Sequence, residues 1–144
     1  MVTGTSFSAT NAEDIITLKD SPTGSILNFY AFDVANRLAD KAVDLTADKD
    51  GNYYICGTTR LTAFNGYALI KTSNQLVRKW ARVESPEYGS ASTKVSFNPV
   101  CQQIEVAGYH TDWYNKYLIG TVVYDSAGIK KWRRSYRTVA TDRQ

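Results

Sequence analysis

Hydrophobic and polar residues alternate over short stretches in the middle of the chain, and turn-forming residues separate these stretches. The alternation predicts four strands at Ala42–Ala47, Tyr53–Thr59, Gly66–Thr72 and Leu76–Glu84. Between the first two, Asp48–Asn52 supplies the Asp-Gly and Gly-Asn steps that tight hairpins favour. We therefore expect a small antiparallel sheet of four strands in this region.

Helical periodicity is weak throughout the chain. No window sustains apolar residues at i, i+3, i+4 and i+7, and the best candidate for a helical turn is Asp33–Lys41. The chain is rich in aromatic residues, which make up 12% of it, and these favour half-buried strands. The fold is therefore expected to be all-β.

The strand pattern repeats. The pattern of Ala47–Trp80 recurs in Ile104–Trp132, and Gly57 and Gly108 lie 51 residues apart. A weaker copy lies upstream, where Ser6–Lys19 aligns with Asp44–Gly57 and Ile26–Asp33 with the strand at Tyr67–Lys71. At the end of the chain, Val139–Asp142 resembles Leu45–Asp48. A period of about 40 to 50 residues rich in short strands is typical of β-propeller blades.

We therefore expect a single domain over residues 1–144, built from β-propeller-like blades of four antiparallel strands, about three blades per chain. The approximate repeats are residues 5–41, 42–90 and 91–138, with a trailing strand at 139–142.

The second copy resembles the SBBP-type (seven-bladed β-propeller) repeats of bacteria and archaea. The residues that carry the resemblance are Asp48, Gly51, Asn52, Tyr54, Gly57, Thr59, Tyr67–Lys71 and Trp80. The third copy keeps Gly108, Thr111, Gly128 and Trp132, and departs from the pattern at Asn98–Gln103. The resemblance implies a propeller of extracellular or surface proteins, usually without known enzymatic activity.

The repeated glycines and tryptophans have predicted structural roles. Gly57 and Gly108 lie within strands, where glycine often marks a close approach of neighbouring backbone. Trp80 and Trp132 recur once per repeat, and residues at such positions usually pack one repeat against the next. We expect both indoles to be buried, at a cost of about 3–5 kcal/mol for truncation to alanine. The alternative is a ring of exposed aromatic residues that stack on sugars.

Charge and cysteine content place few limits on the partner and the compartment of the protein. The net charge is +3, but residues 1–72 carry −2 and residues 73–144 carry +5, which permits an anionic partner without requiring one. Cys56 and Cys101 occupy non-matching positions and are expected to be buried thiols, with a disulfide left open. The N-terminus lacks the pattern of a signal peptide, so the chain is either cytoplasmic or trimmed from a longer secreted precursor.

Three candidate chemical sites favour structural interpretations. Asp48–Asn52 has part of a calcium loop but lacks the later glutamate, so a structural turn is expected and no metal. His110 is the only histidine, and no nucleophile motif accompanies it. Basic residues flank Trp132 and Tyr136 in a way that suits either a guarded edge strand or, less well, a polyanion. We expect no catalytic residues, no cofactor and no nucleic-acid partner.

One aromatic loop is the candidate ligand site. It contains Tyr109, Asp112, Trp113, Tyr114 and Tyr117. Aromatic residues mixed with Asn and Asp in a loop are typical of carbohydrate or protein sites, and packing of the loop over the propeller explains them equally well. The sequence thus predicts a non-catalytic structural or binding module, completed by self-association or by another propeller-forming chain. A carbohydrate-binding propeller is the alternative.

Overall fold

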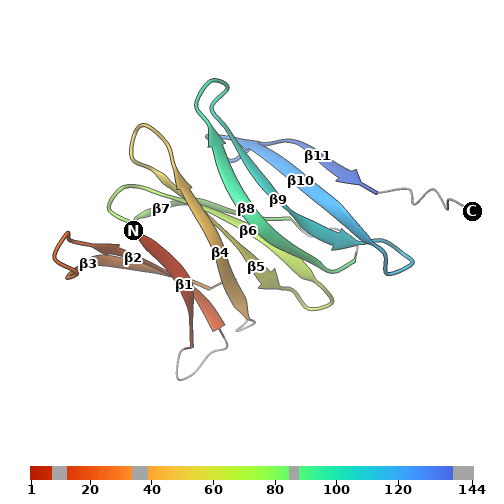
Figure 1. Ribbon diagram of the computed structural model, residues 1–144, viewed down its shortest axis with the longest axis horizontal. Coiled ribbons are helices and arrows are strands. Elements are labelled where there is room, and N and C mark those ends of the chain that lie inside the picture. The colour runs from red at the N-terminus through yellow and green to blue at the C-terminus, as the bar shows by residue number, and fades with distance from the viewer. Residues whose placement is uncertain (8–12, 34–38, 85–87, 138–144) are drawn as a thin grey trace, which may run out of the picture.

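The computed structural model describes residues 1–7, 13–33, 39–84 and 88–137, which form strands and turns without any helix. The strands build three antiparallel sheets, seen side by side in Figure 1. The N-terminal sheet contains β1 (Val2–Phe7), β2 (Glu13–Asp20) and β3 (Ile26–Phe32). The middle sheet contains β4 (Asp40–Ala47), β5 (Tyr53–Arg60), β6 (Asn65–Thr72) and β7 (Arg78–Glu84). The C-terminal sheet contains β8 (Ser90–Asn98), β9 (Gln103–Thr111), β10 (Tyr117–Asp125) and β11 (Lys130–Tyr136).

This architecture confirms the all-β, blade-like fold that the repeats predict. The chain runs through each four-stranded sheet in order, so that sequential strands pair as antiparallel neighbours. The predicted strands of the second copy differ from β4–β7 by at most two residues at either end. Asp40 and Lys41 lie in β4 rather than in a helical turn, and residues 34–38 of that predicted turn lie outside the described residues. The predicted trailing strand at 139–142 also lies outside them.

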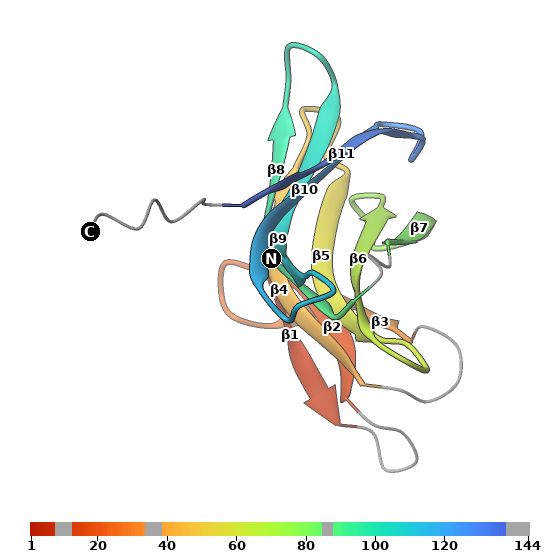
Figure 2. The same ribbon diagram turned by 90° about the vertical axis from the view of Figure 1, so that its right-hand side faces the viewer.

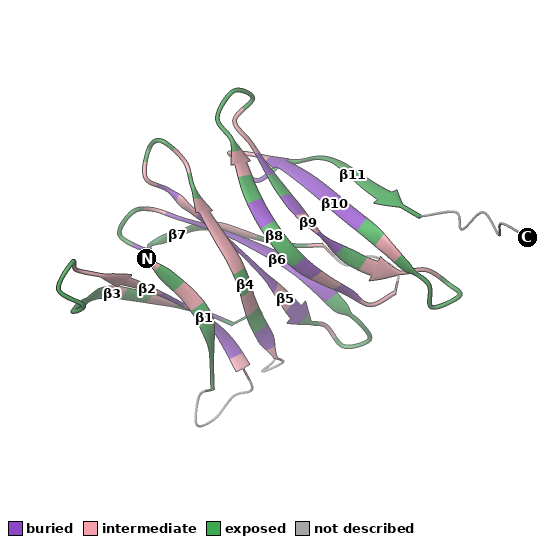
Figure 3. Cartoon of the chain, viewed as in Figure 1, coloured by how far each residue is buried: buried purple, intermediate pink, exposed green. Residues whose placement is uncertain are grey.

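The sheets stack face to face, with the middle sheet between the other two (Figure 2). The core between the N-terminal and middle sheets contains the buried side chains Ile15, Phe32, Ile55, Ala68 and Ile70. The core between the middle and C-terminal sheets contains Tyr54, Cys56, Tyr67, Leu69, Val95, Ile104, Val106, Val122 and Tyr124. Figure 3 shows that β5, β6 and β10 contain mostly buried residues, whereas β3 and β11 contain mostly exposed ones.

Two predicted burials are wrong. Trp80 is half-buried against the second core, where its ring meets Tyr54, but Trp132 is 42% exposed. Trp132 lies on the outer face of the C-terminal sheet, which no other sheet of the described residues covers. Cys56 is buried as expected, and burial raises the pKa of its thiol to about 11. Cys101 is exposed because it lies in the turn between β8 and β9.

The N-terminal sheet differs most from its prediction, because it has three strands and not four. Its strands also hold different places in the repeat. The pairing of β2 with β3 contains a register shift after Lys19, as the pairing of β6 with β7 does after Lys71 and that of β10 with β11 after Val123. Strands β1, β2 and β3 therefore correspond to β5, β6 and β7, and among the described residues no strand of this sheet holds the place that β4 has in the middle sheet.

This assignment corrects the sequence alignment of the first copy by one strand. Hydrophobic spacing alone matches Ile15–Lys19 with Tyr53–Gly57, but the fold matches β2 with β6. Contacts between sheets agree with the fold. β8 contacts β4, β5 and β6 of the preceding sheet, and β4 contacts β1 and β2 of the sheet before it.

Candidate functional site

Aromatic side chains form a row at the end of the molecule where β5 joins β6 and β9 joins β10. Phe64 contacts Tyr88 with ring centres 5.9 Å apart, and Tyr88 contacts Trp113 at 5.8 Å, both edge to face. Trp113, at the end of the row, and the adjacent Tyr114 are each 76% exposed. The row spans two sheets and offers apolar ring surface to solvent.

The turn that presents Trp113 is held by Asp112. Its Oδ1 atom accepts hydrogen bonds from the amides of Tyr114 and Lys116 at 2.8 and 2.9 Å. Its other oxygen pairs with Arg137. The amide of Lys116, followed by that of Tyr114 and by the charge of Arg137, holds the pKa of Asp112 below its ordinary value. Asp112 thus positions the aromatic tip, with its carboxylate already engaged.

The remaining two predicted ligand residues lie elsewhere. Tyr109 and Tyr117 stack edge to face, with ring centres 5.4 Å apart, in β9 and β10. Both are exposed on the outer face of the C-terminal sheet. The structure therefore divides the predicted aromatic site between a loop tip and a sheet face. Sequence reasoning missed Phe64 and Tyr88, since each is a single aromatic residue in a loop distant along the chain.

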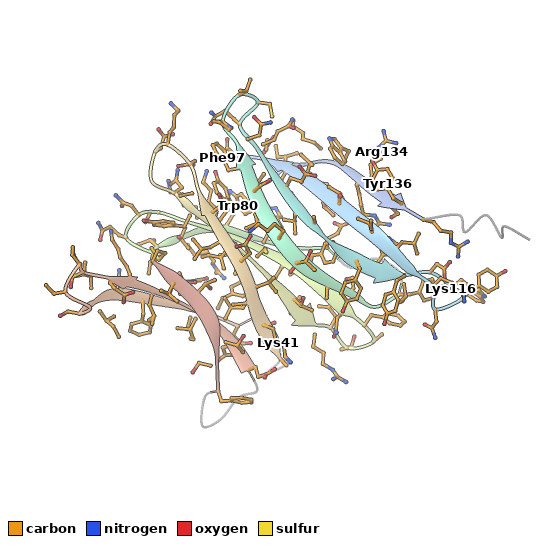
Figure 4. All side chains as sticks on the ribbon, viewed as in Figure 1. Lys41, Trp80, Phe97, Lys116, Arg134 and Tyr136 are labelled. Carbon is orange, nitrogen blue, oxygen red and sulfur yellow. The ribbon has the colours of Figure 1, made fainter. Side chains whose placement is uncertain are left out.

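The outer face of the C-terminal sheet is a second candidate surface. Trp132, Arg134 and Tyr136 project from β11 on this face, beside Ile119 of β10. Arg134 and Tyr136 are labelled in Figure 4 at the side of the molecule farthest from the N-terminal sheet. Strand register makes Trp132 and Arg134 the equivalents of Trp80 and Arg82, which lie on the corresponding face of the middle sheet.

In the middle sheet, that face holds the next sheet through a set of hydrogen bonds. Lys71 Nζ and Trp80 Nε1 donate to the carbonyl of Ser126 at 2.8 and 3.2 Å. Arg82 Nε donates to the carbonyl of Gly128 at 2.7 Å. Both carbonyls belong to the turn that joins β10 and β11 of the C-terminal sheet.

The lysine bond recurs between the N-terminal and middle sheets. Lys19, the equivalent of Lys71, donates to the carbonyl of Asn74 at 2.8 Å, in the turn between β6 and β7. Another recurring bond joins a threonine of β1 or of its equivalent β5 to the first strand of the next sheet, which is β4 or β8. The amide of Ala42 donates to Thr5 Oγ1, and that of Ser92 to Thr58 Oγ1, each at 3.2 Å. The stacking is thus a repeated, specific interface.

On the outer face of the C-terminal sheet the donors are present without acceptors. Within the part of the chain that the structure describes, the Trp132 indole and the Arg134 guanidinium have no hydrogen-bond partner. Lys130 and Arg133, in contrast, pair with Glu84 of the middle sheet. In the predicted basic edge strand, Lys130 and Arg133 therefore form ion pairs within the fold, while Arg134 lies on the outer face beside Trp132.

The predicted calcium turn is a hydrogen-bonded hairpin turn. Asp48 Oδ1 accepts the amides of Asp50 and Asn52, and Oδ2 accepts the Asn52 side chain and the Tyr54 hydroxyl. Partial burial works to raise the pKa of Asp48, but these hydrogen bonds outweigh it and hold the value below normal. The absence of calcium stays a prediction, and the geometry gives it a reason, because the oxygens are already in use.

Two other groups of polar residues come together in the fold. His110 Nε2 lies 2.7 Å from Ser135 Oγ, while its Nδ1 faces the carbonyl of Thr111. A Ser–His–acid triad requires a carboxylate at the second nitrogen. Asp14, Asp33 and Asp40 bring carboxylate oxygens within 4.8 Å of one another. Burial, and then the charge of Asp33, raises the pKa of Asp14. A cluster of acidic residues alone does not define a metal site.

Comparison with known proteins gives no relative. No protein-family model matches the chain, and no curated protein is significantly similar to it. The resemblance to SBBP-type repeats therefore stays a prediction. The described residues contain no helix long and apolar enough to cross a membrane.

Proposed function

We propose that the protein is a non-catalytic structural module of β-propeller repeats that completes its propeller by associating with further copies of itself. One observation carries the proposal. Positions that are buried on both faces of the middle sheet are exposed on the outer faces of the two end sheets. Tyr67 of β6 and Ile55 of β5 are at most 3% exposed, on opposite faces of the middle sheet. Their equivalents on the end sheets, Ile119 of β10 and Val2 of β1, are 59% and 55% exposed.

The exposed end faces favour association over a solitary stack. Repeat arrays need polar caps where the stacking ends, and propellers contain about four to eight blades. Here the N-terminal sheet offers Val2, Leu27 and Phe29 to solvent, and the C-terminal sheet offers Ile119 and Trp132. Two copies joined head to tail in both directions form the simplest closed ring, with six sheets and two-fold symmetry.

Light scattering after gel filtration at micromolar concentration tests the proposal. The expected mass is about twice the 16.1 kDa of one chain. A folded 16.1 kDa monomer that persists at every concentration would refute self-association. A larger mass that appears only after addition of another propeller-forming chain would show that the missing blades come from a different partner.

A carbohydrate-binding function is the second candidate, and the aromatic row favours it. Partly exposed aromatic rings such as Phe64, Tyr88 and Trp113, which contact one another edge to face, can stack on sugar rings. A glycan array separates the two functions, because a purely structural module gives no signal. If a sugar binds, Trp113→Ala should abolish the signal and Trp132→Ala, on the other surface, should preserve it.

A further inference from the structure

The groove on the outer face of the N-terminal sheet is the equivalent of a filled site inside the molecule. It is a shallow groove over β1 and β2, and its lining residues are Val2, Gly4, Thr5, Ser6, Ile16 and Leu18. By strand register, Gly4 of β1 is the equivalent of Gly57 in β5. Ile15 of the N-terminal sheet packs directly on Gly57, so that a Cβ atom added there would lie 2.4 Å from Ile15 Cδ1. One added at Gly4 would meet nothing within 4 Å, so the equivalent surface in the groove is open.

The side chain that matches this groove lies on the outer face of the C-terminal sheet. Counted back from the register shift of each hairpin, Ile119 of β10 has the same position as Ile15 of β2 and Tyr67 of β6. Ile15 packs on Gly57 of the middle sheet, and Tyr67 packs in the same way on Gly120 of the C-terminal sheet. Both side chains are buried, whereas Ile119 is 59% exposed. Among the described residues, Ile119 therefore has the position of a stacking residue and no further sheet to pack on.

Hydrogen-bond donors on the same outer face repeat those of the internal interfaces. In both internal interfaces, a donor of one sheet reaches a carbonyl group in the last hairpin turn of the next sheet. Asn28 Nδ2 donates to a carbonyl of the β6–β7 turn at 2.5 Å, and its equivalent, Trp80 Nε1, donates to one of the β10–β11 turn at 3.2 Å. Trp132 has this position in the C-terminal sheet, and Arg134 lies beside it on the same face. The outer face thus carries the donors for one further turn.

The N-terminal sheet has a turn of the kind that these donors bind. The turn at Ser21–Ser25, between β2 and β3, has the same backbone hydrogen bonds as the β10–β11 turn. Pro22 and Gly24 are therefore the equivalents of Ser126 and Gly128, whose carbonyls accept the donors of the middle sheet. Within the described residues, the carbonyls of Pro22 and Gly24 accept no hydrogen bond. The N-terminal sheet thus combines the groove with two acceptors in the matching turn.

The groove and Ile119 can meet only between two copies, because the middle sheet of a single chain lies between the sheets that carry them (Figure 1). We infer that Ile119 of one copy packs into the groove over Gly4 of a second copy. In the same junction, Trp132 and Arg134 of the first copy donate to the turn at Ser21–Ser25 of the second. This inference rests on the proposed self-association and specifies its contact. The junction would then repeat the apolar contact and the turn bonds of the two interfaces inside the chain.

An exchange of volume between the two contact positions tests the inference in the full chain. Gly4→Val has room in a single copy and valine favours strands, so the circular dichroism spectrum should stay unchanged. Against Ile119 of the second copy, the added valine overpacks the junction and should raise the dimer dissociation constant by about tenfold or more. Ile119→Ala removes as many carbon atoms as this valine adds. The double variant should therefore associate at least about fivefold more tightly than Gly4→Val alone, because the two positions are in contact.

Gly4→Val combined with Val77→Ala is the matched control. Val77 is exposed in the turn between β6 and β7 of the middle sheet, so its truncation should not restore the dimer. Sedimentation equilibrium over a range of protein concentrations measures each dissociation constant. A Gly4→Val protein as tight as the wild type, or a Gly4→Val/Ile119→Ala protein no tighter than the control, would overturn this contact and leave self-association through other surfaces intact. A monomeric wild type would instead refute the proposed self-association, and this contact with it.

Discussion

At the scale of residues, one turn design recurs through the chain. Five hairpin turns begin with Asp or Ser and place their fourth residue at positive φ, as at Gly24, Gly51, Leu76, Asn115 and Gly128. The side chain of the first residue accepts amides from within the turn, as Asp48, Asp112 and Asp125 do. The acidic residues that most resemble ligands in the sequence are thus the ones that the backbone of the turn already uses.

Asp48 should therefore stabilise the fold in a pH-dependent way. Asp48→Asn removes the charge and the Oδ2 acceptor, and should lower the free energy of unfolding by about 1–2 kcal/mol at pH 7. Because the pKa of Asp48 is lowered by folding, its contribution is present above its unfolded value of about 3.9 and is lost as the pH falls through the folded value. Urea unfolding at pH 7 and pH 3 measures the difference, which should shrink at the lower pH.

Asp50→Asn is the control for this substitution, since Asp50 is exposed and its carboxylate pairs with the neighbouring Lys49 at 3.8 Å. It should change the free energy of unfolding by less than about 0.5 kcal/mol. A loss of stability in Asp48→Asn that stays constant between pH 7 and pH 3 would contradict the assigned role of the charge.

Two glycines at one repeat position, Gly4 and Gly108, should respond differently to substitution by alanine. Gly108→Ala forces a Cβ into the backbone of β8 and should cost about 1–3 kcal/mol, the usual cost of overpacking. Gly4→Ala has open space and should be neutral or slightly stabilising in a single copy. Thermal unfolding at low protein concentration compares them. Equal losses in both variants would show that glycine is needed for backbone conformation, and not for the approach of a neighbouring strand.

At the scale of elements, the middle sheet was largely predictable and the N-terminal sheet was not. Strands β4–β7 alternate clearly, and an Asp-Gly turn fixes where the first pair begins. In the first copy, Ile15–Leu18 fits either of two strands, because hydrophobic spacing does not distinguish one strand of a blade from the next. The decisive signal is Val2-Thr3-Gly4-Thr5, which resembles Ile55-Cys56-Gly57-Thr58 but lies at the very start of the sequence.

The two repeated tryptophans give the sharpest contrast between equivalent elements. Trp80→Ala removes a ring that packs on Tyr54 and a hydrogen bond to Ser126, and should cost about 3 kcal/mol. Trp132→Ala removes a ring that no further sheet covers, and should cost less than about 1 kcal/mol in the monomer. Chemical unfolding of both variants at low concentration measures this. Similar losses would mean that Trp132 is packed in a way that its exposure does not indicate.

At the scale of the whole molecule, the candidate sites depend on contacts that local sequence does not encode. Tyr109, Trp113, Tyr114 and Tyr117 are close in sequence, yet strand alternation and a turn place them on two surfaces. Phe64 and Tyr88 join the aromatic row only because two sheets stack. The unoccupied donors of β11 become recognisable only when the middle sheet shows what their equivalents bind.

The stability of the whole molecule should depend on its concentration, because association through the end faces favours the folded state. For a dimer of this size, the melting temperature should rise by about 2–3 °C for each tenfold increase in concentration.

Arg134→Glu should remove most of this dependence of the melting temperature on concentration. The substitution replaces an unpaired donor by a carboxylate that would face the carbonyl oxygens of a stacked turn, and it breaks no contact within the described chain. Arg60→Glu makes the same change of charge on an exposed residue of β5 and should retain the dependence. Calorimetry of the three proteins over a hundredfold range of concentration measures all of these effects. If Arg134→Glu and Arg60→Glu behaved alike, the effect would come from the change in net charge. A wild-type melting temperature that does not change with concentration would contradict association of the end faces with a second copy of the chain.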